Sequence, residues 1–230
     1  MLRTDPARLK LANPHFPQEY YLSALNQEPA YKQTLGLLRK HFDEKTISKI
    51  LDLYHKIAKK DLETAIHSAR VSLRSYQIGL QTGLNKDELG ILLVSALLHD
   101  VGKIEISNKI LKNPGKLTQA EFTRMKNHPE AGVAVVMESE LPRFIPERIL
   151  SGIREHHRRI DGTGYPDGDK LGISAQIIGI ADDSDALSHK RVYKPSLSVS
   201  ETLTVLSSHR GRFDRDLFTL CASSYLYAEK

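Results

Sequence analysis

Apolar residues recur at helical spacing along much of this chain, and almost no stretch alternates as a strand would. In residues 47–58 and 62–69 the apolar positions lie three or four apart, which places them on one face of an α-helix. These positions are Ile47, Ile50, Leu51, Tyr54, Ile57 and Ala58, followed by Leu62, Ala65, Ile66 and Ala69. The pattern predicts an all-α protein, a bundle of helices packed around a core.

Capping boxes indicate where several of these helices begin. A polar cap residue with glutamate three positions later occurs at Asn85 with Glu88, Thr118 with Glu121, and Ser198 with Glu201. Residues 104–117 contain a proline–glycine turn, and residues 161–172 are dense in turn formers. We expect both of these stretches to resist helix formation.

The periodicity becomes regular only near Asp43. Before that point the chain contains Pro14, Pro17 and Pro29 and its apolar spacing is irregular. We predict that residues 1–44 form an amino-terminal helical appendage of unknown function and that residues 45–230 form the main domain. A chain of 230 residues is long enough for this arrangement.

Composition and charge favour a cytoplasmic protein. The single cysteine, Cys221, excludes an internal disulfide and fits a reducing compartment. The longest apolar run is far too short to span a bilayer, and the first residues lack the apolar core of a signal peptide. The net charge of +5 comes from scattered basic residues, which we interpret as a solvated face. We therefore expect neither a membrane nor a long nucleic acid as partner.

The strongest chemical signal is the sequence His99-Asp100-Val101-Gly102-Lys103, which follows an apolar helix predicted over residues 89–98. An imidazole and a carboxylate at a helix end can reach one point, and a carboxylate can bridge two ions. An unpaired charge beside such an apolar helix would be costly. The pair is therefore interpreted as two metal ligands rather than as a surface accident.

Further imidazoles and carboxylates occur on other predicted helices. Glu63 and His67 are four residues apart and share a helix face. His128 stands at a helix start, His156 and His157 are adjacent before the glycine-rich loop, and Asp185 lies in an apolar segment. Each of these alone is more simply a hydrogen-bonded side chain or a cap. Together they are too numerous for one tetrahedral zinc, and they suit two or three iron or manganese ions.

In their order along the chain, these motifs resemble the HD-GYP domain. The resemblance covers residues 62–206. It rests on His99-Asp100 with Gly102-Lys103, His128-Pro129-Glu130, His156-His157, Asp161-Gly162-Thr163-Gly164-Tyr165-Pro166, Ala181-Asp182 and Asp185-Ala186-Leu187. It implies an HD-type helical bundle and a phosphodiesterase that cuts cyclic di-GMP, or a related cyclic dinucleotide, to linear pGpG and onward to GMP where a third ion is bound.

The resemblance also implies roles for individual residues. The metal ligands would be His67, His99, Asp100, His128, His156, His157 and Asp185, with Glu63 added where a third ion is held. Asp100 is expected to act in catalysis as the bridging ligand. Lys103 would touch the scissile phosphate, and Arg191 and Lys194 would hold the phosphates. The loop residues Gly164, Tyr165 and Pro166 would shape the pocket or form a docking surface for a signalling protein.

Four residues depart from the family's usual pattern. Arg158 stands where glutamate is usual, Asp183-Ser184 where Val-Phe is usual, and Gln176 where arginine is frequent. None of these departures removes a ligand, so they bear on substrate fit and loop contacts rather than on metal binding.

Two alternatives to an active phosphodiesterase stay open. One is an HD phosphohydrolase for other nucleotides, and the other is a non-catalytic module that binds a cyclic dinucleotide or a protein. A homodimer is a further hypothesis.

Overall fold

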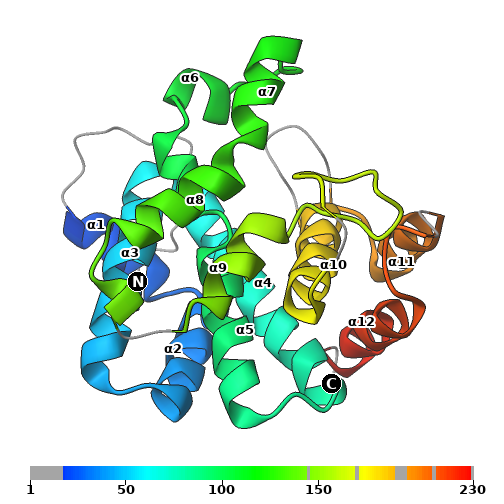
Figure 1. Ribbon diagram of the computed structural model, residues 1–230, viewed down its shortest axis with the longest axis horizontal. Helices are drawn as coiled ribbons and strands as arrows, with labels where there is room; N and C mark the ends of the chain where they lie inside the picture. The colour runs from blue at the N-terminus through cyan, green and yellow to red at the C-terminus, as the bar shows by residue number, and fades with distance from the viewer. Residues whose placement is uncertain (1–17, 144–145, 169–170, 190–195, 209–210, 229–230) are drawn as a thin grey trace, which may run out of the picture.

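The computed structural model describes residues 18–143, 146–168, 171–189, 196–208 and 211–228. Every regular element in these ranges is helical, which confirms the prediction of an all-α fold (Figure 1). Helix α4 lies at the centre and contacts α2, α3, α5, α10 and α12.

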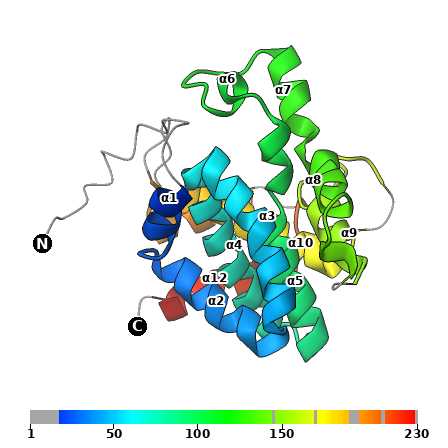
Figure 2. The ribbon, with the colours of Figure 1, turned by 90° about the vertical axis from the view of Figure 1, so that its left-hand side faces the viewer.

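The helices have the following bounds. They are α1 (Gln18–Leu25), α2 (Pro29–His41), α3 (Glu44–Lys60), α4 (Leu62–Gln81), α5 (Lys86–Leu98), α6 (Asn108–Leu111), α7 (Gln119–Lys126), α8 (His128–Met137), α9 (Arg148–Glu155), α10 (Ile173–Ser188), α11 (Val199–Ser208) and α12 (Arg215–Ala228). Two short 3-10 helices, η2 (Val101–Glu105) and η3 (Leu141–Arg143), follow α5 and α8. Figure 2 shows α6 and α7 projecting from one end of the bundle.

Side-chain caps determine where these helices begin. All three predicted capping boxes are present, at Asn85 with Glu88, Thr118 with Glu121, and Ser198 with Glu201. Asp43 caps α3 through the backbone N–H of Thr46, and Asp61 caps α4 through that of Thr64. Each such bond satisfies an N–H that has no partner within its helix.

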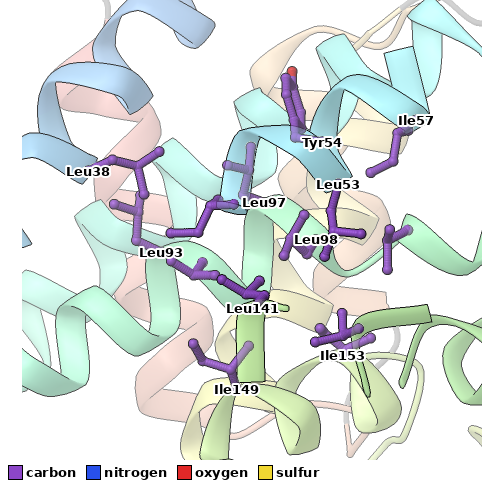
Figure 3. Packing of buried hydrophobic residues seen from close by; sticks show 14 of the residues in the cluster. Leu38, Leu53, Tyr54, Ile57, Leu93, Leu97, Leu98, Leu141, Ile149 and Ile153 are labelled. Carbon is purple, nitrogen blue, oxygen red and sulfur yellow. The ribbon is translucent and has the colours of Figure 1, made fainter. Parts of the chain in front are cut away.

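Two apolar clusters hold α4 and α5 in place. In the first, Leu93, Leu97 and Leu98 of α5 pack with residues of α2, α3, η3 and α9 (Figure 3). In the second, Leu92 of α5 packs with residues of α4, α10 and α12, including the buried Cys221. Because α5 is buried on nearly every side, its carboxyl-terminal end at His99 has a fixed position in the interior.

The two segments expected to resist helix behave differently. Residues 161–168 form no helix, as predicted, whereas 104–117 includes the short helix α6. The first turn of α6 begins after Ser107, a residue type that commonly precedes helices, and this local signal was missed. Among the described residues, no helix combines the length and the apolar character needed to cross a membrane.

Candidate metal centre

Three histidines are held in the same way by backbone carbonyls. Nδ1 of His99 lies 2.7 Å from the carbonyl oxygen of Ala96, Nδ1 of His128 lies 2.7 Å from that of Met125, and Nδ1 of His156 lies 2.8 Å from that of Ile153. A carbonyl oxygen can only accept, so each Nδ1 must carry the proton and donate it. In the neutral imidazole this leaves Nε2 with a bare lone pair, which is the arrangement that metal-binding histidines use.

The Asp100 carboxylate lies among these Nε2 atoms. Its Oδ1 is 3.2 Å from Nε2 of His128, and its Oδ2 is 3.3 Å from Nε2 of His99. Lys103 donates to Oδ2 at 2.6 Å. The two carboxylate oxygens therefore face different histidines, a position from which one carboxylate can bridge two ions.

His67 of α4 enters the centre between two carboxylates of α10. Its Nδ1 donates to Asp185 Oδ2 at 2.6 Å, which leaves Nε2 bare and 3.0 Å from Asp182 Oδ1. The Asp185 carboxylate also accepts from Nε and Nη2 of Arg70 at 2.8 and 2.9 Å and lies 3.0 Å from Nδ1 of His189. Asp185 is thus occupied in orienting His67 and pairing with Arg70.

Asp182, rather than Asp185, lies with the candidate ligands. Three groups of side chains bring their ligand atoms within 4.8 Å of one another: His128 with His156 and His157, His67 with His99 and Asp100, and His99 with His156 and Asp182. Asp185 belongs to none of these groups. The geometry therefore favours Asp182 for the ligand role that the resemblance gave to Asp185.

The remaining predicted site residues lie in different surroundings. Glu63 is exposed in the first turn of α4 and belongs to none of the three groups, although it is not without interactions. Arg191 and Lys194 lie outside the described residues, so their predicted contact with the phosphates stays a prediction.

Burial and charge shift the pKa values of these groups strongly. Burial, followed by the charges of His157 and His99, holds the pKa of His156 well below its ordinary value. Burial alone would raise the pKa of Asp100, but Lys103 and His99 hold it well below the usual range. Burial likewise lowers the pKa of His157 to about 3. Burial alone would lower the pKa of His67, but the carboxylates of Asp182 and Asp185 raise it above the ordinary value. His156 and His157 therefore favour the neutral imidazole, and Asp100 favours the ionised carboxylate.

These residues fit a group of divalent cations. Nε2 of His128 lies 3.3 Å from Nε2 of His156, so two bare lone pairs face each other. Nε2 of His67 and of His99 are buried with no hydrogen-bond partner among the described residues. Buried polar atoms without partners are costly, and a cation shared between them would remove that cost.

The Gly164-Tyr165-Pro166 loop covers one side of the centre. The backbone N–H of Tyr165 donates to the carbonyl oxygen of His157 at 3.1 Å, and the two rings have centroids 4.7 Å apart. A Cβ on Gly164 would collide with the same carbonyl, so glycine is required for this approach. The loop therefore lies against His157, and its predicted role in shaping a pocket or docking a partner stays a prediction.

Sequence reasoning missed Lys126, a basic side chain beside the ring of Tyr165. The Lys126 ammonium lies 5.3 Å from the ring centre of Tyr165 and 5.0 Å from that of Phe122. Both distances are typical of cation–π contacts. The spacing of Lys126 and Phe122, four apart on one helix, was the available signal.

The four departures from the family pattern have identifiable contacts. Arg158 is buried and pairs with Glu155 at 3.4 Å, and Ser184 donates to the carbonyl oxygen of Ala181. Gln176 donates to the carbonyl oxygen of Leu171, and Asp183 pairs with Arg159. None of these contacts takes a candidate ligand away from the centre.

Comparison with known proteins identifies relatives of the chain. A sequence profile of the HD domain family matches residues 46–217. A cyclic di-GMP phosphodiesterase response regulator of Xanthomonas campestris is 38% identical over 70% of this chain and 43% of its own length. A cyclic di-GMP phosphodiesterase of Thermotoga maritima is 32% identical over 86% of this chain and 54% of its own. A 3'3'-cGAMP-specific phosphodiesterase of Vibrio cholerae is 30% identical over 89% of this chain and 45% of its own length. The chain thus spans about half the length of these relatives.

Solved structures share the fold at low sequence identity. The phosphodiesterase PgpH HD domain of L. monocytogenes, in complex with cyclic-di-AMP, gives a TM-score of 0.58 at 15% identity and covers 77% of this chain and 95% of its own. An HDG"Y"P protein from Bdellovibrio bacteriovorus gives a TM-score of 0.60 at 17% sequence identity. The match covers 90% of this chain and 67% of that protein's chain. Because the profile match runs through most of the chain and the motifs follow in the same order, this chain belongs to the HD domain family, within its HD-GYP group.

Proposed function

We propose that this chain is a metal-dependent phosphodiesterase that opens a cyclic dinucleotide, cyclic di-GMP or a close relative, to the linear product. The observation that carries the proposal is the convergence of bare Nε2 atoms on the Asp100 carboxylate. The relatives described above are phosphodiesterases for cyclic di-GMP or 3'3'-cGAMP, which supports this substrate class.

The proposed ligands are drawn from five helical segments. They are His67, His99, Asp100, His128, His156, His157 and Asp182, with Glu63 as a candidate for a third ion. Two or three ions are expected, and the nitrogen and oxygen donors without sulfur favour iron or manganese. The chemistry that such ions supply is Lewis acidity toward phosphate oxygen and a lowered pKa of water.

The protein's own groups orient the imidazoles and offset the negative charge of the substrate. The carbonyls of Ala96, Met125 and Ile153 fix the imidazoles, so no rotation is needed when a ligand arrives. Lys103, whose side chain is 19% exposed, is placed to offset negative charge on the phosphoryl oxygens. Lys126, together with Arg191 and Lys194, is a candidate to hold the second phosphate.

Metal and product analysis on one preparation tests the proposal. Protein purified without oxygen is analysed for its elements and then incubated with cyclic di-GMP, 3'3'-cGAMP or cyclic di-AMP. We expect two or three ions of iron or manganese per chain and a linear dinucleotide product from at least one substrate. A matched Asp100→Asn protein should give no product while its helical content stays unchanged.

A non-catalytic binding module is the alternative of a different class. It would retain cyclic dinucleotide without turnover, even with its metal complement present. Metal-loaded protein that binds the dinucleotide but yields no linear product would favour this alternative. Docking of a signalling protein on the loop and formation of a homodimer stay predictions.

A further inference from the structure

A largely buried ion pair lies between the segments that carry His156 and Asp182. Nη2 of Arg159 donates to Asp183 Oδ1 at 2.9 Å, and the side chains are only 2% and 25% exposed. Arg159 follows the end of α9, and Asp183 lies on α10. Each partner is therefore a close chain neighbour of a proposed metal ligand.

Arg159 makes further bonds that reach the backbone of the centre. Its Nη1 donates to the carbonyl oxygen of His156 at 2.8 Å and to that of Arg158 at 2.9 Å. One rigid guanidinium thus connects the peptide group of a proposed ligand to the residue that follows Asp182. Lysine, with a single ammonium, cannot reproduce this planar set of donors.

The surroundings leave the guanidinium little room to move. The Phe213 ring centre lies 4.8 Å from Cζ of Arg159. A Cβ on Gly179 would lie 3.0 Å from Nη1 of Arg159 and 2.7 Å from the carbonyl oxygen of His156. Glycine at this position lets α10 approach the end of α9 closely. The ion pair is therefore enclosed by packing as well as by hydrogen bonds.

We propose that Arg159 and Asp183 are positioning residues that fix the spacing between His156 and Asp182 before metal binds. The proposal rests on the metal centre described under the proposed function, and it adds a role for two residues that touch no ion. Side chains behind the direct ligands commonly orient them, and their substitution typically weakens metal affinity about 10- to 100-fold.

Opposite charge removals separate positioning from a simple effect of charge. Asp183→Asn removes a negative charge near the centre, and Arg159→Met removes a positive one. If the pair acts only through its electric field, the first change weakens Mn2+ binding and the second strengthens it. If the pair holds the two segments together, both changes weaken Mn2+ binding, by about 10- to 100-fold.

The test is calorimetric titration of Mn2+ into metal-free full chain, with helical content checked by circular dichroism. Glu140→Gln is the control because Lys49–Glu140, at 2.7 Å, also joins two segments, α3 and the turn before η3, and neither segment carries a residue of the centre. We expect this control to bind Mn2+ as the parent does. Arg159→Lys should resemble Arg159→Met, since it keeps the charge but not the planar donors.

A double variant decides the matter if a single variant does not fold. Arg159→Met with Asp183→Val leaves no unpaired charge, and buried ion pairs replaced by apolar groups generally retain stability. We expect this protein to fold and to bind Mn2+ at least 10-fold more weakly than the parent. Parent-like affinity in the double variant, or opposite shifts in the two single variants, would overturn the proposal. A parent chain that binds no Mn2+ would instead refute the proposed metal centre itself.

Discussion

The candidate ligand histidines of this centre are oriented by the hydrogen bonds that their Nδ1 atoms make. Backbone carbonyl oxygens accept hydrogen bonds from the Nδ1–H groups of His99, His128 and His156, and the Asp185 carboxylate accepts one from that of His67. The bare Nε2 atoms then point inward without any help from a metal. This arrangement is built into the helix ends, because each carbonyl belongs to the residue three positions earlier.

Sequence reasoning named Asp185 as a ligand beside the histidines, whereas the geometry favours Asp182. The two residues are three apart on α10 and therefore share one helix face. Their roles depend on the rotation of α10 and on Arg70, a residue of α4 that is far away in the sequence. Arg70 and His67 occupy the Asp185 carboxylate, which leaves Asp182 beside His99 and His156.

The first prediction distinguishes these two aspartates. Asp182→Asn should remove a ligand, and we expect about one ion per chain to be lost along with phosphodiesterase activity. Asp185→Asn should retain the ions but bind them about 10- to 100-fold more weakly, because His67 loses the acceptor that orients it. Elemental analysis and Mn2+ titration of both proteins provide the measurement. Retention of the full metal content by Asp182→Asn would contradict this assignment.

The second prediction concerns Lys103. Its ammonium pairs with Asp100 and is partly exposed, so it can also meet a substrate phosphate. Lys103→Met should lower kcat by about 10²- to 10³-fold, the usual loss for one donor that stabilises transition-state charge, with a smaller change in KM. Steady-state kinetics on the preferred dinucleotide give both values. Metal content must be measured on the same sample, because loss of ions would also lower kcat.

At the scale of elements, local signals predicted the helix starts, and close packing between elements stayed hidden. Asn85 and Thr118 begin α5 and α7 through bonds within four residues, so their sequence patterns sufficed. The approach of η2 to α8 has no local signature. It depends on Gly102, where a Cβ would collide with the carbonyl of His128 and the N–H of Gly132.

The third prediction compares Gly102 in η2 with Gly36 in α2, two glycines with opposite surroundings. The added methyl group of Gly102→Ala would push the backbone of η2 away from that of α8. The change should therefore lower the free energy of unfolding by about 1–3 kcal/mol, and it should weaken metal binding because it shifts His128. Gly36, on the exposed side of α2, has no atom within 4 Å of an added Cβ. Gly36→Ala should instead raise the free energy of unfolding by about 0.5–1 kcal/mol. Urea denaturation of both proteins without metal measures these changes, and equal effects would refute the packing argument.

At the scale of the whole molecule, the amino-terminal helices share the core of the main bundle. Leu25 of α1 and Leu38 of α2 belong to the same apolar cluster as residues of α3 and α5. Thr34 of α2 also bonds to Ser72 of α4 at 3.1 Å. The predicted division between residues 44 and 45 stays a prediction. It was based on irregular apolar spacing, which does not reveal which helices share a core.

The proposed metal centre joins five helical segments of this bundle, and the last prediction follows from that connection. In the unfolded chain the ligands of α4, α5, α8, α9 and α10 are far apart, so ions bind the folded state preferentially. Free Mn2+ at 100 times its dissociation constant should then stabilise the fold by about 2.7 kcal/mol for each site filled. For a chain of this size, about 2–4 °C per kcal/mol gives a rise in Tm of about 5–10 °C for each site. Differential scanning calorimetry with Mn2+ and with a chelator measures the difference. The Asp182→Asn protein is the control and should lose much of the rise, whereas an equal rise in both proteins would place the bound ions elsewhere in the chain.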